Sequence, residues 1–404
     1  MPKIELPAYV TRVMDTLSAA GYRGYVVGGS LRDLLRGVAP HDYDMTTDAQ
    51  PDEMLEIFRD FRVIPTGLKH GTLTVMSEGN PIEVTTHRVD GAYADARHPE
   101  SVSFTRKLTG DLSRRDFTVN AMAWNGETGL VDLFEGQSDL QNRILRTVGD
   151  PDTRFCEDAL RILRLFRFCA QLGFDIEENT LLGAARTAAG LSKISVERVF
   201  GEITRLLEAP FAEKGLGALF AAGCEKYAFF DTVMEVNAFC GVDGLPREAA
   251  LRLSWMLPAL TAEQAVALGK RYHAPNAFGA ALAAYAEGAR EKLPQSAYEA
   301  RRFTTRYWHY WRGILALQRA RGADVSEAEA LCAQVARDGS AVEVRRLAVS
   351  GKELQESVGV RPARTGALLL RLQDLVWQEP ARNKRVTLLE AAREICERER
   401  DFCE

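Results

Sequence analysis

Long apolar runs and closely paired cysteines are both missing from this sequence of 404 residues. No apolar stretch approaches the ~20 residues that a membrane-spanning helix needs, and the opening MPKIELPAYV lacks the apolar core of a signal peptide. We therefore expect a cytoplasmic protein with no membrane partner. The seven cysteines include no close CxxC pair, so their spacing favours neither a disulfide framework nor a zinc site.

An excess of basic residues is also absent, because the formal net charge is -5. A nucleic-acid partner would therefore have to be bound by local basic patches. Hydrophobic residues make up 46% of the chain and charged residues 26%, which is typical of a globular protein. The length predicts two or more domains. Nothing in the sequence implies a stable protein partner.

The β-rich runs lie almost entirely before residue 149. They read YVVGGS, GTLTVMSE, PIEVTTHRV and SVSFT. From Pro151 onward helical patterns dominate, as in DALRILRLFRFCAQLG, where apolar residues recur at helical spacing and Gly173 is a natural stop. We predict an α+β head followed by an all-α region, with breaks favoured at GLPREAA and RARGADVS.

Two aspartates stand one residue apart in HDYDMTTDA, residues 41–49. In a strand, Asp42 and Asp44 would point to the same side and repel each other unless a cation lay between them. The stretch is either a solvent-facing turn or a divalent metal site. Glu83, in the strand-like IEV, is either a third ligand or an outward-facing residue of an alternating strand.

Upstream of this pair lies GGSLRDLLRG, a glycine turn between a strand and a helix. Gly28 and Gly29 allow a tight turn, exposed N–H groups at a helix start favour phosphate, Ser30 adds a hydroxyl and Arg32 a charge. Taken alone, such a turn is weak evidence. Followed by Asp-x-Asp, it offers a triphosphate cradle beside two ligands suited to Mg²⁺, which nucleotidyl transfer requires.

GGSLRDLLRG…HDYDMTTDA, RRDFTVNAMAW, EDALRILRLFRF and ISVERVFGE together resemble the successive motifs of the class II tRNA nucleotidyltransferases, within the bacterial CCA-adding and poly(A) polymerase family. The match runs in order over roughly residues 20–205. The resemblance implies a polymerase-β-like head, then a helical neck, body and tail. We place these four parts at residues 1–148, 149–212, 213–322 and 323–404.

The same resemblance implies an activity: template-independent addition of CCA to the 3′ end of tRNA from CTP and ATP, by two-metal chemistry with Mg²⁺ and release of pyrophosphate. A poly(A) polymerase, or an enzyme that adds only CC or only A, is the nearest alternative. A catalytically silent RNA-binding protein is an alternative from a different class.

In RRDFTVNAMAW, Arg114 and Arg115 precede Asp116. The simplest interpretation is an Arg–Asp salt bridge at the edge of an element. The resemblance implies instead that Asp116 contacts the ribose of the nucleotide, where a carboxylate can accept from a 2′-hydroxyl, and that Arg115 lies near the phosphates.

In EDALRILRLFRF, the polar residues Asp158, Arg161, Arg164 and Arg167 share one helix face. An ion-paired surface is the bland alternative to a nucleotide site. Cytosine and adenine both present an amino donor next to a ring-nitrogen acceptor, which suits a carboxylate beside a guanidinium. Guanine and uracil present the reverse order and would leave both protein groups unmatched, at a high cost if buried. The resemblance makes Asp158 and Arg161 the amino-acid template.

Three further segments give weaker predictions. THRVDGAYADARHPESVSF, residues 86–104, has the composition of a mobile loop, and the resemblance gives it a role in the switch from C to A addition. Residues 301–313, RRFTTRYWHYWRG, are either an RNA-contacting surface or part of a helical core. Lys384 and Arg385, in the tail-like closing segment, are candidate contacts to the tRNA backbone.

Overall fold

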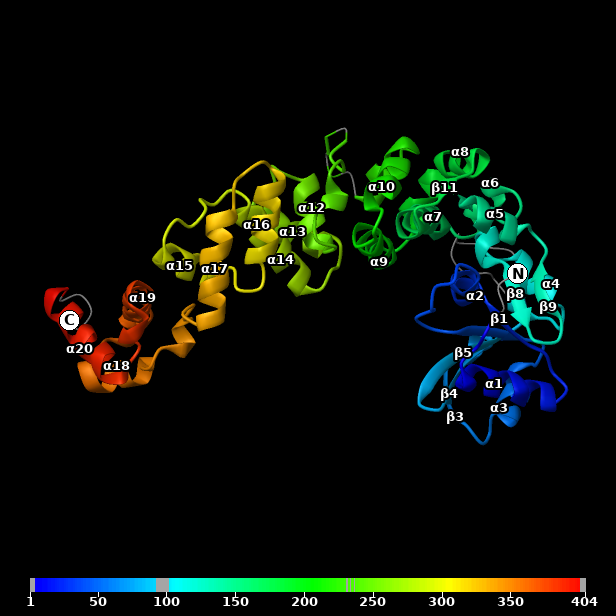
Figure 1. Cartoon of the computed structure of the whole chain (residues 1–404), viewed down its shortest axis with the longest axis horizontal. Helices are drawn as coiled ribbons and strands as arrows, with labels where there is room; N and C mark the ends of the chain where they lie inside the picture. The colour runs from blue at the N-terminus through cyan, green and yellow to red at the C-terminus, as the bar shows by residue number, and fades with distance from the viewer. Residues whose placement is uncertain (1–3, 92–101, 230–231, 233, 236, 400–404) are drawn as a thin grey trace. The chain divides into compact units, whose positions relative to one another are not determined.

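The structure, a computed structural model, describes residues 4–91, 102–229, 232, 234–235 and 237–399. The chain divides into two compact units, Met1–Asp243 and Gly244–Glu404 (Figure 1). This division falls where the predicted break GLPREAA begins. The finer division into head, neck, body and tail stays a prediction.

The first unit is built on a seven-stranded mixed sheet in the order β3-β4-β5-β2-β1-β8-β9. Strands β2 and β5 run parallel, and the other neighbouring strands are antiparallel. The strands predicted at YVVGGS, GTLTVMSE and PIEVTTHRV are therefore confirmed. The sheet strands are β1 (Gly24–Val27), β2 (Asp44–Thr47), β3 (Arg62–Gly67), β4 (Thr72–Ser77), β5 (Asn80–Thr86), β8 (Met122–Asn125) and β9 (Gly129–Asp132).

Burial alternates along β4, where Leu73 and Val75 are buried, because successive side chains of a strand face opposite sides of the sheet. Helices α1 and α3 pack on this strand (Figure 1). Helix α1 buries Val10 and Val13. A second small core lies under α4. The helices of this part are α1 (Ala8–Ala19), α2 (Gly28–Leu35), α3 (Pro51–Ile57), α4 (Leu108–Ser113) and α5 (Gly136–Asn142). The minor strand pairs are β6 (Arg88–Asp90) with β7 (Val102–Phe104) and β10 (Ile144–Leu145) with β11 (Asp175–Ile176).

Helices complete the first unit, as the apolar periodicity predicts. Helix α7 (Leu160–Leu172) buries Ile162, Phe166 and Ala170, and it ends at Gly173, whose φ of 68° lies in the left-handed region that glycine tolerates. The other helices here are α6 (Pro151–Glu157), α8 (Glu178–Thr187), α9 (Val196–Leu207), α10 (Ala212–Ala221) and α11 (Glu225–Ala228).

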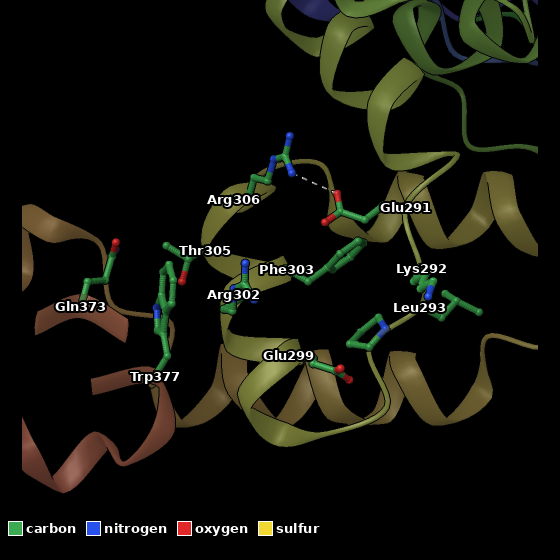
Figure 2. Close-up of a pocket in the computed structure, with 11 residues that line it drawn as sticks. Glu291, Lys292, Leu293, Glu299, Arg302, Phe303, Thr305, Arg306, Gln373 and Trp377 are labelled. Carbon is green, nitrogen blue, oxygen red and sulfur yellow. Dashed lines mark hydrogen bonds and ion pairs between the residues drawn. The ribbon is translucent and has the colours of Figure 1, made fainter. Parts of the chain in front are cut away.

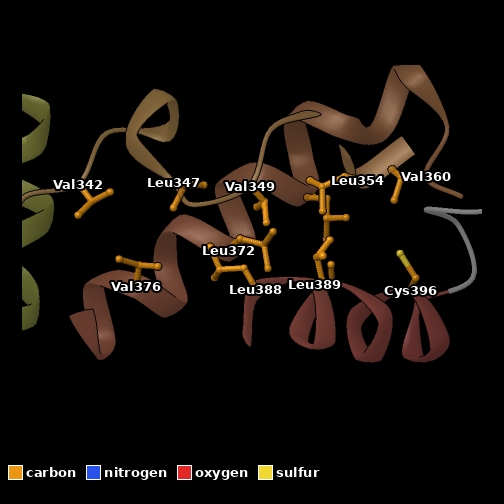
Figure 3. Packing of buried hydrophobic residues seen from close by; sticks show 12 residues of the cluster. Val342, Leu347, Val349, Leu354, Val360, Leu372, Val376, Leu388, Leu389 and Cys396 are labelled. Carbon is orange, nitrogen blue, oxygen red and sulfur yellow. The ribbon is translucent and has the colours of Figure 1, made fainter. Parts of the chain in front are cut away.

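In the second unit, the described residues form helices and connecting turns. The last three helices share a core in which Leu354, Leu368, Leu372 and Leu388 are buried and Cys396 packs as a small apolar side chain (Figure 3). The helices are α12 (Ala249–Met256), α13 (Ala262–Arg271), α14 (Asn276–Gly288), α15 (Ala297–Arg306), α16 (Trp311–Ala320), α17 (Ser326–Asp338), α18 (Gly351–Val358), α19 (Pro362–Gln378) and α20 (Arg385–Arg398). Across the described parts of both units, no helix combines the length and the apolarity that crossing a membrane requires.

Candidate active site

A strongly charged cavity of about 520 Å³ lies between the glycine turn after β1 and helix α7. Eight arginines and three aspartates contribute to its lining, so arginines outnumber acids and the cavity favours an anionic ligand. The lining residues are Gly28, Gly29, Arg32, Asp44, Arg88, Arg114, Arg115, Asp116, Asn120, Asp158, Leu160, Arg161, Arg164, Arg167, Phe168, Gln171 and Arg198. The cavity thus brings together most of the residues that the four sequence motifs single out.

The glycine turn presents bare backbone to the cavity. Gly28 has a φ of 68°, and a Cβ atom there would lie 3.3 Å from Nη1 of Arg115 and 3.8 Å from Oδ2 of Asp44. A side chain would therefore fill the space between an arginine and a carboxylate. The hydroxyl of Ser30 is buried and donates to the Val27 carbonyl at 2.8 Å, so here it braces the turn and does not line the cavity.

The two aspartates of the acidic pair differ in backbone structure. Strand β2 begins at Asp44, and Asp42 lies in an exposed bend just before it, so the two are not same-side positions of one strand. A third carboxylate stands beside Asp44, because Asp44 and Glu83 are register partners on the parallel strands β2 and β5. Burial raises the pKa of Asp44 to about 6, and the charges of Asp42 and Glu83 act in the same direction against Arg115.

These carboxylates fit a hard divalent cation. The half-buried carboxylate of Asp44, whose pKa is raised by desolvation and by two acidic neighbours, gains from a nearby positive charge, and Mg²⁺ takes oxygen ligands. In the described part of the chain, no group of three or more His, Cys, Asp or Glu side chains is arranged to ligate a metal ion by itself. Mg²⁺ is usually bound through one or two carboxylates, with substrate phosphates and water completing its coordination.

Arg114 and Arg115 are oriented by a residue that the sequence reasoning missed. Both guanidinium groups pair with the fully buried Asp111, at 2.6 and 3.0 Å respectively. Their positive charges hold the pKa of Asp111 at about 2, despite a burial that would raise it. The spacing i, i+3, i+4 in DLSRR was the available signal. The alternative of a salt bridge between these arginines and Asp116 gives way to pairs with Asp111, while Asp116 pairs with Arg164.

Asp116 connects the head to α7. It accepts two hydrogen bonds from Arg164, at 2.6 and 2.9 Å, while its other oxygen accepts from the amide groups of Phe117 and Asn120. Asn120 in turn accepts from Arg32 at 2.9 Å. Asp116 is buried, and the charge of Arg164 keeps its pKa well below the ordinary value. A continuous polar network therefore runs from the glycine turn to α7.

Asp158 and Arg161 are not on one continuous helix, contrary to the sequence interpretation. Helix α6 ends at Glu157, and Asp158 adopts an extended backbone before α7 begins. Its side chain accepts from the Leu160 amide at 3.1 Å and pairs with Arg198 of α9 at 3.0 Å. Arg161 pairs with Glu157 at 2.5 Å and donates to the Arg114 carbonyl. Both side chains nevertheless line the same cavity.

The second unit contains a separate cavity of about 500 Å³ (Figure 2). Helix α15 contributes Arg302 and Arg306 to its lining, and α19 contributes Trp377. Of the aromatics in the segment 301–313, Phe303, Tyr307 and Trp311 are buried. The segment 301–313 therefore divides, with several aromatics in the core and most of its arginines exposed.

The two remaining sequence predictions concern the start of α20 and the loop within residues 86–104. Lys384 and Arg385 are exposed at the start of α20, and Arg385 pairs with Glu353 at 2.6 Å. Most of the predicted mobile loop, residues 92–101, lies outside the described residues.

The cavity thus combines the glycine turn and Asp44 of the sheet with the polar side chains of Asp158, Arg161 and Arg164. Two family models match parts of the chain. Residues 24–146 match the poly A polymerase head domain, and residues 173–229 match the model described as the probable RNA and SrmB-binding site of polymerase A.

Curated proteins that are similar to this chain include CCA-adding enzymes. The CCA-adding enzyme of Streptococcus gordonii is 48% identical over 215 residues, which cover 53% of this chain and 53% of that protein. The CCA-adding enzyme of Streptococcus thermophilus is 46% identical over 229 residues, 56% of each. The chain therefore spans about half the length of the curated relatives it matches.

Similarity to a solved structure extends further. The crystal structure of the Bacillus stearothermophilus CCA-adding enzyme in complex with CTP superposes with a TM-score of 0.79 over 97% of this chain and 98% of that one, at 28% identity. Residues 24–146 thus match the poly A polymerase head domain, and the chain as a whole resembles the CCA-adding enzymes.

Proposed function

We propose that the protein is a cytoplasmic CCA tRNA nucleotidyltransferase, which completes tRNA 3′ ends from CTP and ATP without a nucleic-acid template. One observation carries the proposal. A single cavity holds a glycine turn, a carboxylate with a raised pKa and an Asp–Arg set on the facing helices. Phosphate binding, metal binding and base reading would then act on one nucleotide. The CTP complex of the Bacillus stearothermophilus relative supports the choice of substrate.

The triphosphate would lie at the positive side of this cavity. Backbone amides of Gly28 and Gly29 and the guanidinium groups of Arg32 and Arg115 would bind its oxygens. Arg164 and Arg167 of α7 add positive charge from the other wall. Because these groups are already in place, binding would need little rearrangement of the protein.

Mg²⁺ would be held by Asp42 and Asp44, with Glu83 as a third candidate. When bound, the ion would supply activation of the attacking 3′ hydroxyl and neutralisation of charge on the pyrophosphate leaving group. The contribution of the chain is to hold the carboxylates at the start of β2, next to the bare backbone of Gly28. Arg115 lies beside Gly28, and its positive charge would favour the approach of the phosphates.

Base selection would rest on Asp158 and Arg161. An Asp158 oxygen would accept from the amino group that cytosine and adenine share, and Arg161 would donate to the adjacent ring nitrogen. Guanine and uracil would leave both groups unmatched, and a site of that kind rejects a wrong partner strongly. Asp116 would contact the ribose or hold Arg164 against the nucleotide; its hydrogen bonds to Arg164 support the second role directly.

The tRNA would be bound through local basic groups, since the net charge is negative. Arg302, Lys292 and Trp377 around the second cavity are candidate contacts, as are Lys384 and Arg385. Replacing any one phosphate-contacting cation should weaken tRNA binding and reduce the salt dependence of the affinity by about one unit of slope.

Single-nucleotide extension tests the proposal. The full chain is incubated with tRNA that lacks only its terminal CCA. Each labelled nucleotide is supplied in a separate reaction. CTP alone should add two residues, ATP alone should add none, and ATP should add one residue to tRNA ending in CC. Repeated addition from ATP alone would favour a poly(A) polymerase, which the head-domain match also permits. Binding of tRNA without extension would indicate a silent RNA-binding protein.

A further inference from the structure

Phe168 is an apolar side chain in a cavity lined by charge. Among the described residues that line the cavity, Phe168 and Leu160 are the two apolar side chains larger than glycine. Phe168 is only 7% exposed, and its ring packs edge-on against Phe117 at a centroid distance of 5.8 Å. Besides this aromatic contact, the Phe168 ring also lies near charged side chains.

Three guanidinium groups converge on this one ring. The Cζ atoms of Arg167, Arg164 and Arg32 lie 4.1, 5.4 and 5.4 Å from its centroid. Two of these arginines come from α7 and the third comes from α2, at the glycine turn. All three line the cavity. The ring therefore sits where cations from the head and from the neck helix meet.

Such a cluster of like charges is costly unless something offsets it. Burial lowers the pKa of Arg167 to about 10, and Arg164 and Arg205 act in the same direction. Each of the three arginines has one acidic partner, namely Asp33 for Arg32, Asp116 for Arg164 and Glu202 for Arg167. An aromatic face attracts cations without carrying a charge that would repel a phosphate. The ring can thus gather arginines and leave the cavity positive.

We propose that Phe168 is a positioning residue for the nucleotide: its ring face holds Arg32, Arg164 and Arg167 together so that they bind the polyphosphate of the ligand. The inference rests on the proposed function only for the identity of the nucleotide. The ligand chemistry that it requires is a polyphosphate anion. An aliphatic residue of similar size would fill the space and lose the attraction.

Phe166 provides a matched control on the same helix. It is fully buried on the opposite side of α7 and is not one of the residues that line the cavity. Phe166→Leu and Phe168→Leu make the same chemical change two residues apart. A general loss of packing should appear in both variants, whereas loss of arginine positioning should appear only in Phe168→Leu.

The test is calorimetric titration of the full chain with inorganic tripolyphosphate, and separately with CTP, without tRNA. Phe168→Leu should weaken binding of both ligands about tenfold, as expected when cation–π contacts of this kind are removed. Phe166→Leu should leave both affinities within about twofold, whatever it does to the thermal midpoint. A trifluorinated phenylalanine at position 168 keeps the shape and weakens the ring face, so it should give an intermediate loss. It also decides the question if Phe168→Leu fails to fold.

Three results would overturn the inference. Unchanged tripolyphosphate affinity in both position-168 variants would show that the ring does not position the arginines. Weaker binding of CTP but not of tripolyphosphate would mean that the ring contacts the base directly. If the wild-type chain does not bind tripolyphosphate at all, the ligand of this cavity is not a polyphosphate anion. By contrast, a chain that binds tripolyphosphate as expected but never extends tRNA would contradict the proposed function alone.

Discussion

Asp44 and Glu83 are register partners on the parallel strands β2 and β5. Side chains at paired positions of adjacent strands lie on the same face of a sheet, so these two carboxylates stand side by side. With Asp42 just before β2, three negative charges gather at one place, and the pKa of Asp44 rises to about 6. A bound cation would reduce the repulsion among these three carboxylates.

The first prediction concerns that cation. Asp44→Asn should lower the rate of nucleotide addition about 1000-fold, because a metal ligand contributes several kcal/mol of transition-state stabilisation. The thermal midpoint in chelator should stay constant or rise, since one repelling charge is gone. Asp60→Asn is the control, because Asp60 is exposed and is not among the residues that line the cavity. Normal single-turnover rates for Asp44→Asn in Mg²⁺ would refute the metal assignment.

The second prediction concerns base choice. Asp158 is ordered by Arg198 and by the Leu160 amide, so its position does not depend on bound nucleotide. Asp158→Ala should reduce the preference for CTP over UTP by about 100-fold, because the amino group of cytosine loses its acceptor and uracil no longer faces a mismatched carboxylate. Steady-state incorporation of each of the four nucleotides measures this.

Asp152→Ala is the control for that experiment, since Asp152 pairs with Arg186 on the surface of the same segment. If Asp158→Ala kept wild-type selectivity while turning over, the amino-acid template would have to lie elsewhere.

The third prediction concerns Asp111, which is buried between two arginines. Asp111→Asn should lower the free energy of unfolding by about 3–5 kcal/mol, as expected when one partner of a buried ion pair is removed. It should also raise the KM for CTP, since Arg115 loses its anchor beside Gly28. Urea unfolding and initial rates check the two effects, and Asp111→Glu should recover part of both. If both the stability and the KM for CTP were unchanged, Asp111 would not be needed to position Arg115.

The fourth prediction is a pH dependence that comes from His87. Burial lowers the pKa of His87 to about 4; Asp111 and Asp48 oppose this shift, while Arg114 and Arg115 reinforce it. Its Nδ1 lies 2.8 Å from the hydroxyl of Thr46. Because the folded pKa is below the unfolded value of 6.5, the contribution of neutral His87 to stability is complete above pH 6.5 and is lost as the pH falls towards 4.

The expected loss over that range is about 3 kcal/mol at most. His87→Asn retains a polar group and does not titrate, so its unfolding free energy should change less between pH 6.5 and pH 4 than that of the wild type. Parallel curves for the two proteins would show that His87 does not contribute to acid sensitivity.

Sequence alone predicted the parts of this molecule that depend on local patterns. The strand before Gly28, the helix that ends at Gly173 and the helical second half all follow from periodicity and turn residues. The helix break at Asp158 was missed because apolar residues recur on both sides of it. The extended backbone of Asp158 ends α6, and its side chain accepts from the Leu160 amide at the start of α7.

Partners distant in sequence were also beyond prediction. Arg198 reaches Asp158 across 40 residues, and Arg164 reaches Asp116 across 48. Nothing in a local window indicates which carboxylate a given arginine will pair with, because the fold decides which surfaces meet. The role of Phe168 was hidden for the same reason, since its residue type is that of a core position.

Direct sequencing of product 3′ ends tests the central claim most directly. The full chain is incubated with tRNA lacking its last three nucleotides, Mg²⁺ and all four nucleotides at equal concentration. The account predicts that the great majority of extended molecules end in CCA and grow no further. Runs of A, mixed bases, or products that stop at CC in the presence of ATP would contradict it.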